Sequence, residues 1–114
     1  MASSNVWLKS GRTFELLGTG VTVTGAGNWL YKDSPHATFQ AVVVGTGAVT
    51  ATVTIEVSND ALYALSTVAG TITLSGTTSN SDGFTTTDAP WKYVRANVTA
   101  VSGTAATVTV LMGV

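Results

Sequence analysis

His36 is the only histidine of the chain and the first candidate for catalysis, because "KDSPHATF" places it close to a hydroxyl and a carboxylate. A Ser-His-Asp site needs a histidine that is oriented by a carboxylate and hydrogen-bonded to a nucleophilic serine. Ser34 and Asp33 are neighbours in the sequence, but no nucleophile elbow is present. We interpret His36 as a turn residue that precedes a strand, and we expect no catalytic residues and no enzymatic activity.

Metal and phosphate sites find equally little support in these residues. One histidine and no cysteine cannot supply the three or four ligands that zinc needs. Asp60, Asp82 and Asp88 fall in expected loops, but the spacing of an EF-hand is absent, so we expect aspartates that form turns. The glycine-rich "GTGVTVTGAGNW" lacks the G-K-[ST] ending of a phosphate loop. No pair of acids is singled out for glycoside hydrolysis. The sequence predicts no metal and no cofactor.

Aromatic and arginine residues form the one constellation that suggests binding. Trp91, Tyr93 and Arg95 are spaced two residues apart, so they would line one face of a strand. Trp29 and Tyr31, nearer the N-terminus, have the same spacing. Tryptophan, tyrosine and arginine are the residues enriched at binding hot spots. The alternative is local packing, with Arg95 stacked on an aromatic ring or paired with Glu56. The candidate interaction residues are Trp7, Arg12, Trp29, Tyr31, Trp91, Tyr93 and Arg95.

The elements that would position these residues are strands, because apolar residues recur with a period of two. "GVTVTG", "HATFQAVVVG", "TATVTIEVS", "TITLSG", "YVRANVTAV" and "AATVTVLM" are all expected strands. The three valines of residues 42–44 indicate burial on both faces or a bend. The residues expected to point inward are Ala51, Val53, Ile55, Val57, Val94, Ala96, Val98, Ala100, Ala106, Val108, Val110 and Met112.

Turn signals separate these runs and predict the connections. Glycine supplies positive φ, and Asn or Asp bonds its own backbone, at "GTG", "SND", "SNSDG" and "SG". Two hairpins are predicted, one through "GTGAV" and one through "SGT". Short strands at regular spacing predict an all-β antiparallel sandwich, jelly-roll or Ig-like, over residues 19–114. Residues 1–18 are expected to be an N-terminal arm or a first strand.

Composition limits the possible partners of this single domain. Only 10% of its 114 residues are charged, against about 25% in an ordinary domain, and the net charge is −1. Nucleic-acid binding needs a basic footprint and membrane-surface binding needs a basic amphipathic helix, so neither is expected. A neutral, Thr-rich surface gives little electrostatic repulsion between free molecules. Such a surface is suited to a protein whose faces are covered by neighbours. The alternative is an ordinary bias of β-proteins toward Thr and Val.

The order of elements in residues 38–114 adds a resemblance. A strand ends in "EVSND", "TITLSG" and "TTSNSDGF" follow, and then come "PWKYVRANV", a "VSG" turn and a closing "TVTVLMG". This order resembles small β-sandwich virion proteins encoded in the structural modules of tailed bacteriophages. The resemblance implies a capsid decoration (cement) protein on the capsid surface, made in the host cytoplasm. Its partners would be the major capsid protein and copies of itself, in a trimer or a dimer.

Two alternatives remain open at this stage. One is a small tail or head-completion protein of the same kind of particle. The other is a carbohydrate-binding module for host attachment, with Trp29, Trp91 and Tyr93 as platforms for a glycan. The "SND" turn and the "YVR" strand are shared with carbohydrate-binding jelly rolls, but "ALYAL" stands here in place of their usual Gly-and-Trp continuation.

Overall fold

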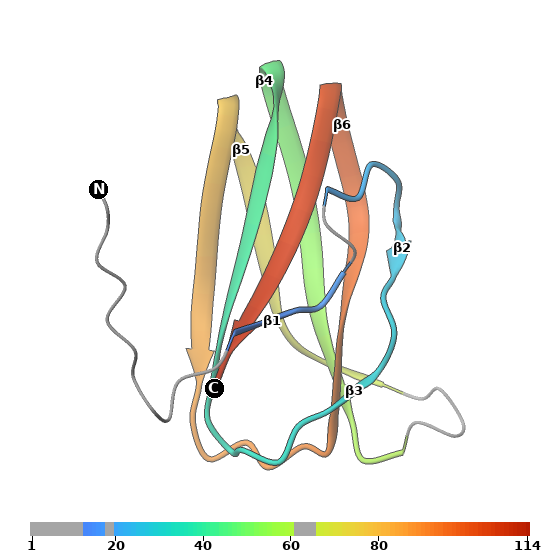
Figure 1. Cartoon of the computed structure of the whole chain (residues 1–114), viewed down its shortest axis with the longest axis vertical. Coiled ribbons are helices and arrows are strands. Elements are labelled where there is room, and N and C mark those ends of the chain that lie inside the picture. Colours follow the sequence, from blue (N-terminus) through green and yellow to red (C-terminus); the bar gives the residue numbers. More distant parts are fainter. Residues whose placement is uncertain (1–12, 18–19, 61–65) are drawn as a thin grey trace.

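Three long strands form the body of the protein. The computed structural model describes residues 13–17, 20–60 and 66–114, and every regular element in that part is a strand. The long strands are β4 (Ala37–Ser58), β5 (Thr67–Thr86) and β6 (Tyr93–Gly113), with β4 hydrogen-bonded between the other two (Figure 1). All of the pairings are antiparallel. The prediction of an all-β antiparallel fold is confirmed.

Each long strand bends near its middle, and the three bends lie together at one end of the molecule (Figure 1). The register of β4 shifts there against both neighbours, between Val44 and Ala48 on the β5 side and between Val44 and Thr50 on the β6 side. We call this end the corner. One half of each strand forms layer A (residues 37–44, 79–86 and 107–113), and the other half forms layer B (residues 48–58, 67–77 and 93–102).

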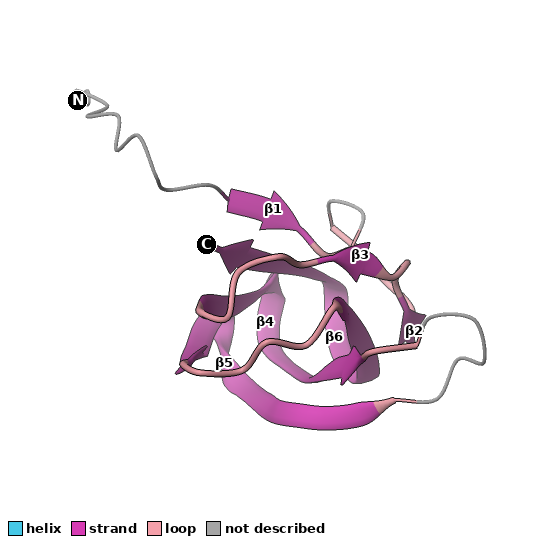
Figure 2. Cartoon of the chain, turned by 90° about the horizontal axis from the view of Figure 1, so that it is seen from below, coloured by secondary structure: helices cyan, strands magenta, loops and turns pink. Residues whose placement is uncertain are grey.

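The sandwich is therefore one sheet folded over on itself, and the strands enclose the space between its two layers when seen along their length (Figure 2). The two predicted hairpins are wrong. Residues 37–44 pair with β5 and β6 and not with residues 48–58, and the two halves of β6 likewise pair with β4. The turn signals mark the corner instead, where Gly47 has φ +73° and Gly103 has φ +127°.

Strict alternation predicted the core correctly except at one position. All of the residues expected to point inward are buried except Ala100, which is exposed. Thr52 pairs with Ala100 and Val53 pairs with Val98, so Thr99 is an extra residue in a β-bulge. The bulge reverses the alternation after Val98, and Val101 packs against the core in place of Ala100.

Two predictions about strand extent also need correction. "GVTVTG" is not a strand, because Val21 makes only an isolated bridge with Val108 and Val23 is exposed. "TITLSG" and "SNSDG" were expected to be a short strand and a break, but both belong to the 20-residue β5. β4 supplies a partner for residues 79–86 of β5, so tertiary pairing overrides the local turn signal. Of the two alternatives for residues 42–44, burial on both faces is wrong, since Val44 is 50% exposed. The three valines pair regularly with both neighbours, and the bend comes directly after Val44.

Three short strands cover the outer edge of β6. β1 (Thr13–Glu15) pairs with it in layer A, and β2 (Gly25–Ala26) and β3 (Leu30–Tyr31) pair with it in layer B. β1 lies within the span expected to be an arm or first strand, and Leu16 and Leu17, which follow it, are buried in the core. Among the residues that the structure describes, no helix is long and apolar enough to cross a membrane.

Candidate functional site

Four of the candidate interaction residues lie together beside layer B. Tyr31 of β3 pairs with Tyr93 of β6, and Arg95 follows two residues later on the same side of the strand. Trp29 comes from the connection between β2 and β3, and its ring lies 4.4 Å from the Arg95 guanidinium carbon. We call Trp29, Tyr31, Tyr93 and Arg95 the aromatic face. The tertiary fold thus joins the two parity pairs that the sequence showed separately.

Glu56 is the charged centre of this region and is only 7% exposed. Its carboxylate accepts hydrogen bonds from Arg95 Nε at 2.7 Å, Asn97 Nδ2 at 3.0 Å and Ser66 Oγ at 3.3 Å. Burial alone raises the pKa of Glu56, but the hydrogen bonds from Asn97 and Arg95, the Arg95 charge and the Ser66 hydroxyl together lower it below its ordinary value. Glu56 is therefore a satisfied anion.

Both forms of local packing considered for Arg95 are present. Arg95 pairs with Glu56 and also stacks on Trp29, so its positive charge is engaged from two sides. Tyr31 and Tyr93 form an edge-to-face pair with centroids 5.9 Å apart, and Tyr31 remains 62% exposed. Of the four residues, Tyr31 offers the most surface to a partner.

Trp91 does not extend the aromatic face. It precedes the first residue of β6 and packs against the core at the open end of the sandwich, opposite the corner. A cavity of about 400 Å³ lies there between the layers. Its lining includes Lys32, Phe39, Val57, Ala69, Ala89 and Trp91. The candidates Trp7 and Arg12 lie outside the described residues.

Lys32 is a buried group that the sequence interpretation missed. It is 4% exposed, and its Nζ donates to the carbonyl oxygens of Ser34 at 2.5 Å and Ala89 at 2.9 Å. Burial lowers the pKa of Lys32 because the charged amine loses solvation. The lysine joins the loop before β4 to the loop before β6. No sequence pattern identifies such a residue, because its acceptors are backbone atoms of a distant segment.

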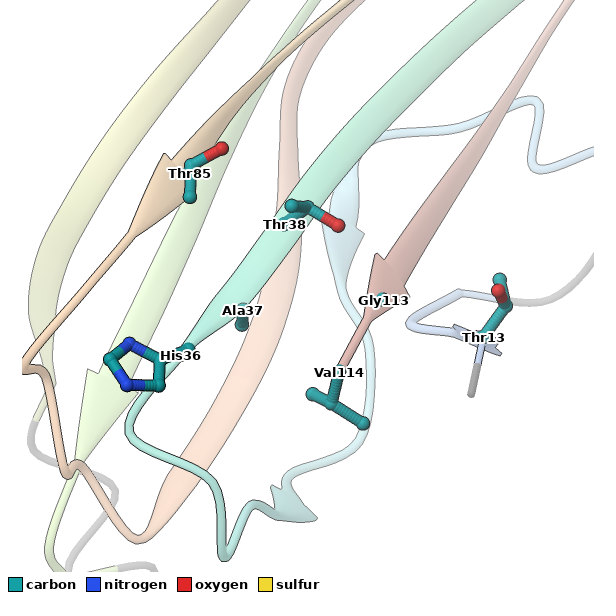
Figure 3. Close-up of a pocket in the computed structure, with 7 residues that line it drawn as sticks. All are labelled: Thr13, His36, Ala37, Thr38, Thr85, Gly113 and Val114. Atoms are coloured by element: carbon teal, nitrogen blue, oxygen red, sulfur yellow. The ribbon is translucent and has the colours of Figure 1, made fainter. Parts of the chain in front are cut away.

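The surroundings of His36 match a turn. The Ser34 hydroxyl accepts from the backbone N–H of His36 at 3.2 Å and donates to its carbonyl at 2.9 Å, so it bonds the main chain of His36. β4 begins at the next residue. His36 borders a shallow hollow of about 360 Å³ shared with Thr13, Ala37, Thr38, Thr85, Gly113 and Val114, none of which is acidic (Figure 3).

The carboxylates of the described residues form no group that could hold a metal ion. Asp82 was expected in a loop but lies within β5, where it keeps the local bond of a turn aspartate by accepting from the Gly83 N–H at 2.8 Å. At the end of β4 the backbone N–H of Asp60 donates to the Ser58 hydroxyl at 2.9 Å, so the serine side chain forms the "SND" turn.

The outer face of layer A differs sharply from the aromatic face. β4, β5 and β6 each contribute four outward-facing residues to it, and none of these is charged. We call this surface the bare face; its residues are Thr38, Gln40, Val42, Val44, Ser79, Ser81, Gly83, Thr85, Thr107, Thr109, Leu111 and Gly113. Val44 is 50% exposed at its corner end. The sequence interpretation named no residue of this face as a binding candidate, although its residues on β6 lie at outward positions of an alternating run.

In comparisons with known proteins, no family profile, no curated protein and no solved structure matches this chain.

Proposed function

We propose that the chain is a non-enzymatic structural protein of a virion, and specifically a capsid decoration protein that binds the outside of the major capsid protein shell. The observation that carries this proposal is the bare face. It is a sheet surface of three strands, rich in threonine, serine and aliphatic residues, without a charged side chain. The order of elements in residues 38–114, which resembles small virion proteins of tailed phages, supports the same function.

An uncharged sheet face suits protein docking for a physical reason. The centres of protein interfaces are depleted of charged residues, because each buried charge must be desolvated. Threonine hydroxyls bond readily to a partner, while the aliphatic groups of Val42, Val44 and Leu111 supply apolar contact area. The bare face can therefore be covered without leaving a charge unpaired. A free surface of this kind opposes association only weakly.

Repetition of a weak contact over the shell would give a decoration protein its effective affinity. One molecule gains only modest free energy from a small, mostly polar contact. Subunits that bridge neighbouring capsomers engage several contacts at once, so the effective affinity rises without any stronger single contact. In this proposal the bare face lies against the shell, and the aromatic face on the other layer points away from it.

The test is binding to empty, undecorated shells assembled from the major capsid protein of the phage that carries this chain. We expect saturable binding of purified protein at micromolar concentration, measured by co-sedimentation with the shells. Val44→Lys should weaken binding about tenfold or more, because docking would bury an unpaired ammonium. Thr99→Lys is the matched control, because it adds the same charge at an exposed position of the other layer.

Three outcomes would overturn the proposal. The first is no binding of the wild-type protein to the shells at micromolar concentration. The second is equal loss of binding in Val44→Lys and Thr99→Lys. The third is retention of the protein on isolated tails alone, which would support the tail-protein alternative. Binding to a glycan array that Tyr31→Ala abolishes would support host attachment, because Tyr31 is the most exposed ring of the aromatic face.

A further inference from the structure

The outer edge of β5 is open. β5 pairs with β4 along almost its whole length, and no other described strand pairs with it, whereas β1, β2 and β3 cover the opposite edge of the sheet. An open edge presents a row of unpaired backbone N–H and C=O groups to other chains. Proteins usually protect such edges with lysine, proline or short strands. β5 has 20 residues and contains no Lys, Arg, Glu or Pro.

The two halves of β5 differ in protection. In layer A, Asp82 pairs with the fully buried Ala41 and so stands on the core side of the strand. An inward-pointing charge at an edge is one of the features that prevent pairing with another strand. In layer B, residues 67–76 carry no charge, and Val68 is 53% exposed. The layer B half is therefore the part of the edge that can accept a strand.

The sequence of this half reads alike in both directions. In "GTITLSG", residues 70–76, Thr73 is central, with Ile72 and Leu74 on either side, then Thr71 and Ser75, then two glycines. Antiparallel pairing of two identical strands about a two-fold axis places residues at equal distances from the centre opposite one another. Each aliphatic residue then faces an aliphatic residue, and each hydroxyl faces a hydroxyl, which are favourable cross-strand pairs.

We propose that residues 70–76 of β5 pair antiparallel with the same segment of a second copy of this chain, with Thr73 on the two-fold axis. Layer B then continues from one molecule into the other. The assembly closes at two, because β2 and β3 cover the other edge of layer B in each copy. The segment carries no charge, so two copies approach without repulsion between the paired strands. The proposal concerns the isolated protein and does not depend on the virion function.

The character of the interface follows from burial within one chain. Ile72 and Leu74 are already buried in the core, so dimer formation adds little apolar burial at these positions. The new contacts are main-chain hydrogen bonds and threonine and serine side chains on the outer face of the sheet. Interfaces of this limited size lie at the weak end of specific association. We expect a dimer that forms at micromolar concentration and dissociates on dilution.

The first test is sedimentation equilibrium over a range of concentrations. The wild-type protein should approach twice the 11.6 kDa chain mass as its concentration rises. Thr73→Lys should remain at the chain mass, because it places two ammonium groups opposite each other at the axis. Thr99→Lys adds the same charge on β6 of the same layer and should dimerise like the wild type. Thermal melting of both variants checks that they are folded.

The second test uses the absence of cysteine from the chain. Directly opposite residues of an antiparallel pair have Cβ atoms about 5 Å apart, close to the separation in a disulfide. Under mild oxidation, Thr73→Cys should give a covalent dimer as the main product. Thr85→Cys, in the protected half of β5, and Thr99→Cys should stay mostly uncrosslinked at the same concentration.

Several results would overturn the proposal. One is a wild-type protein that stays at the chain mass up to its solubility limit. Another is equal cross-linking of all three cysteine variants. A third is slow exchange, persisting in monomeric Thr73→Lys, of those amides of residues 71–75 that point away from β4, which would show that this chain covers its own edge. If the dimer is not found, the proposal that the bare face binds the shell still stands. If Val44→Lys loses shell binding, the dimer proposal is unaffected. The two proposals can therefore fail separately.

Discussion

Glu56 and Arg95 are directly opposite residues of β4 and β6, and the Arg95 Nε donates to the Glu56 carboxylate at 2.7 Å. The pair holds the central strand to its neighbour on the outer face of layer B. Asn97 bonds the second carboxylate oxygen, and Trp29 covers the guanidinium. The pair is thus shielded from water more than an ordinary surface salt bridge.

We expect Glu56→Gln to lower the free energy of unfolding by about 1–2 kcal/mol at neutral pH. Glutamine keeps the size of the side chain, but it loses the charge that faces Arg95 and retains only one oxygen acceptor. Urea denaturation at pH 7 measures the change. Asp88→Asn removes an exposed carboxylate and should change the stability by less than about 0.5 kcal/mol. Equal effects of the two variants would contradict a structural role of the pair.

The same pair predicts a dependence on acid. The pKa of Glu56 in the folded protein lies below its ordinary value of 4.5, so the folded state favours the ionised carboxylate. The stabilisation is present above pH 4.5 and is lost as the pH falls through the lowered pKa of the folded state. The difference in stability between wild type and Glu56→Gln should therefore shrink as the pH is lowered from about 6 to about 3. A constant difference over that range would count against this role.

Lys32 predicts that stability also depends on pH in the alkaline range. Burial lowers the pKa of Lys32 from its ordinary value of 10.5, so between the two pKa values the unfolded chain binds more protons than the folded chain. Stability then rises with pH through that window. Relative to Lys32→Met, the wild type should gain stability as the pH rises toward 10.5. Lys92→Met removes an exposed lysine and is the control for the loss of a positive charge. Urea titrations of the wild type and both variants at several pH values measure the difference.

The corner predicts a contrast between two glycines. A Cβ at Gly103 would lie 2.7 Å from the Ala48 carbonyl oxygen, and φ is +127°, whereas a Cβ at Gly47 would meet nothing within 4 Å. We expect Gly103→Ala to destabilise the protein by about 3 kcal/mol and Gly47→Ala by about 1 kcal/mol. Thermal and urea denaturation of both variants test this. A Gly103→Ala variant no less stable than Gly47→Ala would show that the strands are not closely packed at the corner.

Asp82 predicts a gain of association. Asp82→Asn removes the inward-pointing charge at the edge of layer A, and an asparagine oxygen can still accept from the Gly83 N–H. We expect species heavier than the dimer in sedimentation experiments, because the layer A half of the β5 edge loses its protection and can accept a further strand. Asp88→Asn changes the net charge equally and should stop at the dimer, as the wild type does. Species heavier than the dimer in both variants would mean that net charge alone controls association.

The sequence predicted local periodicity well and long-range pairing poorly. Alternation in residues 51–57 and 106–112 assigned the buried face correctly, because one face of each strand meets the core. The bulge at Thr99 was invisible, because an extra residue is defined only against the opposing strand. The hairpins failed for a related reason. A glycine turn permits a reversal, but only the partner strands decide whether its two flanks pair with each other or with β4, β5 and β6.

The candidate site was predictable in its residue types but not in its grouping. Parity joined Trp29 with Tyr31 and Tyr93 with Arg95, and the fold then brought the two pairs together through β3 and β6. Trp91 was wrongly aligned with them, because β6 begins after it. Lys32 and the bare face were missed altogether. The burial of Lys32 and the grouping of the bare face depend on neighbours that are distant in the sequence. The residue types alone, a lysine and several threonines, do not indicate those neighbours.

Because every long strand runs through both layers, three continuous backbones join the two halves of this sandwich at the corner, and the halves cannot slide past each other as separate sheets can. The layers can separate only from the far end, with the corner as the hinge. A pull on either face is thus borne by the same continuous backbones. If the bare face docks as proposed, a load applied there would pass into the second layer through the strands themselves and not only through side-chain contacts.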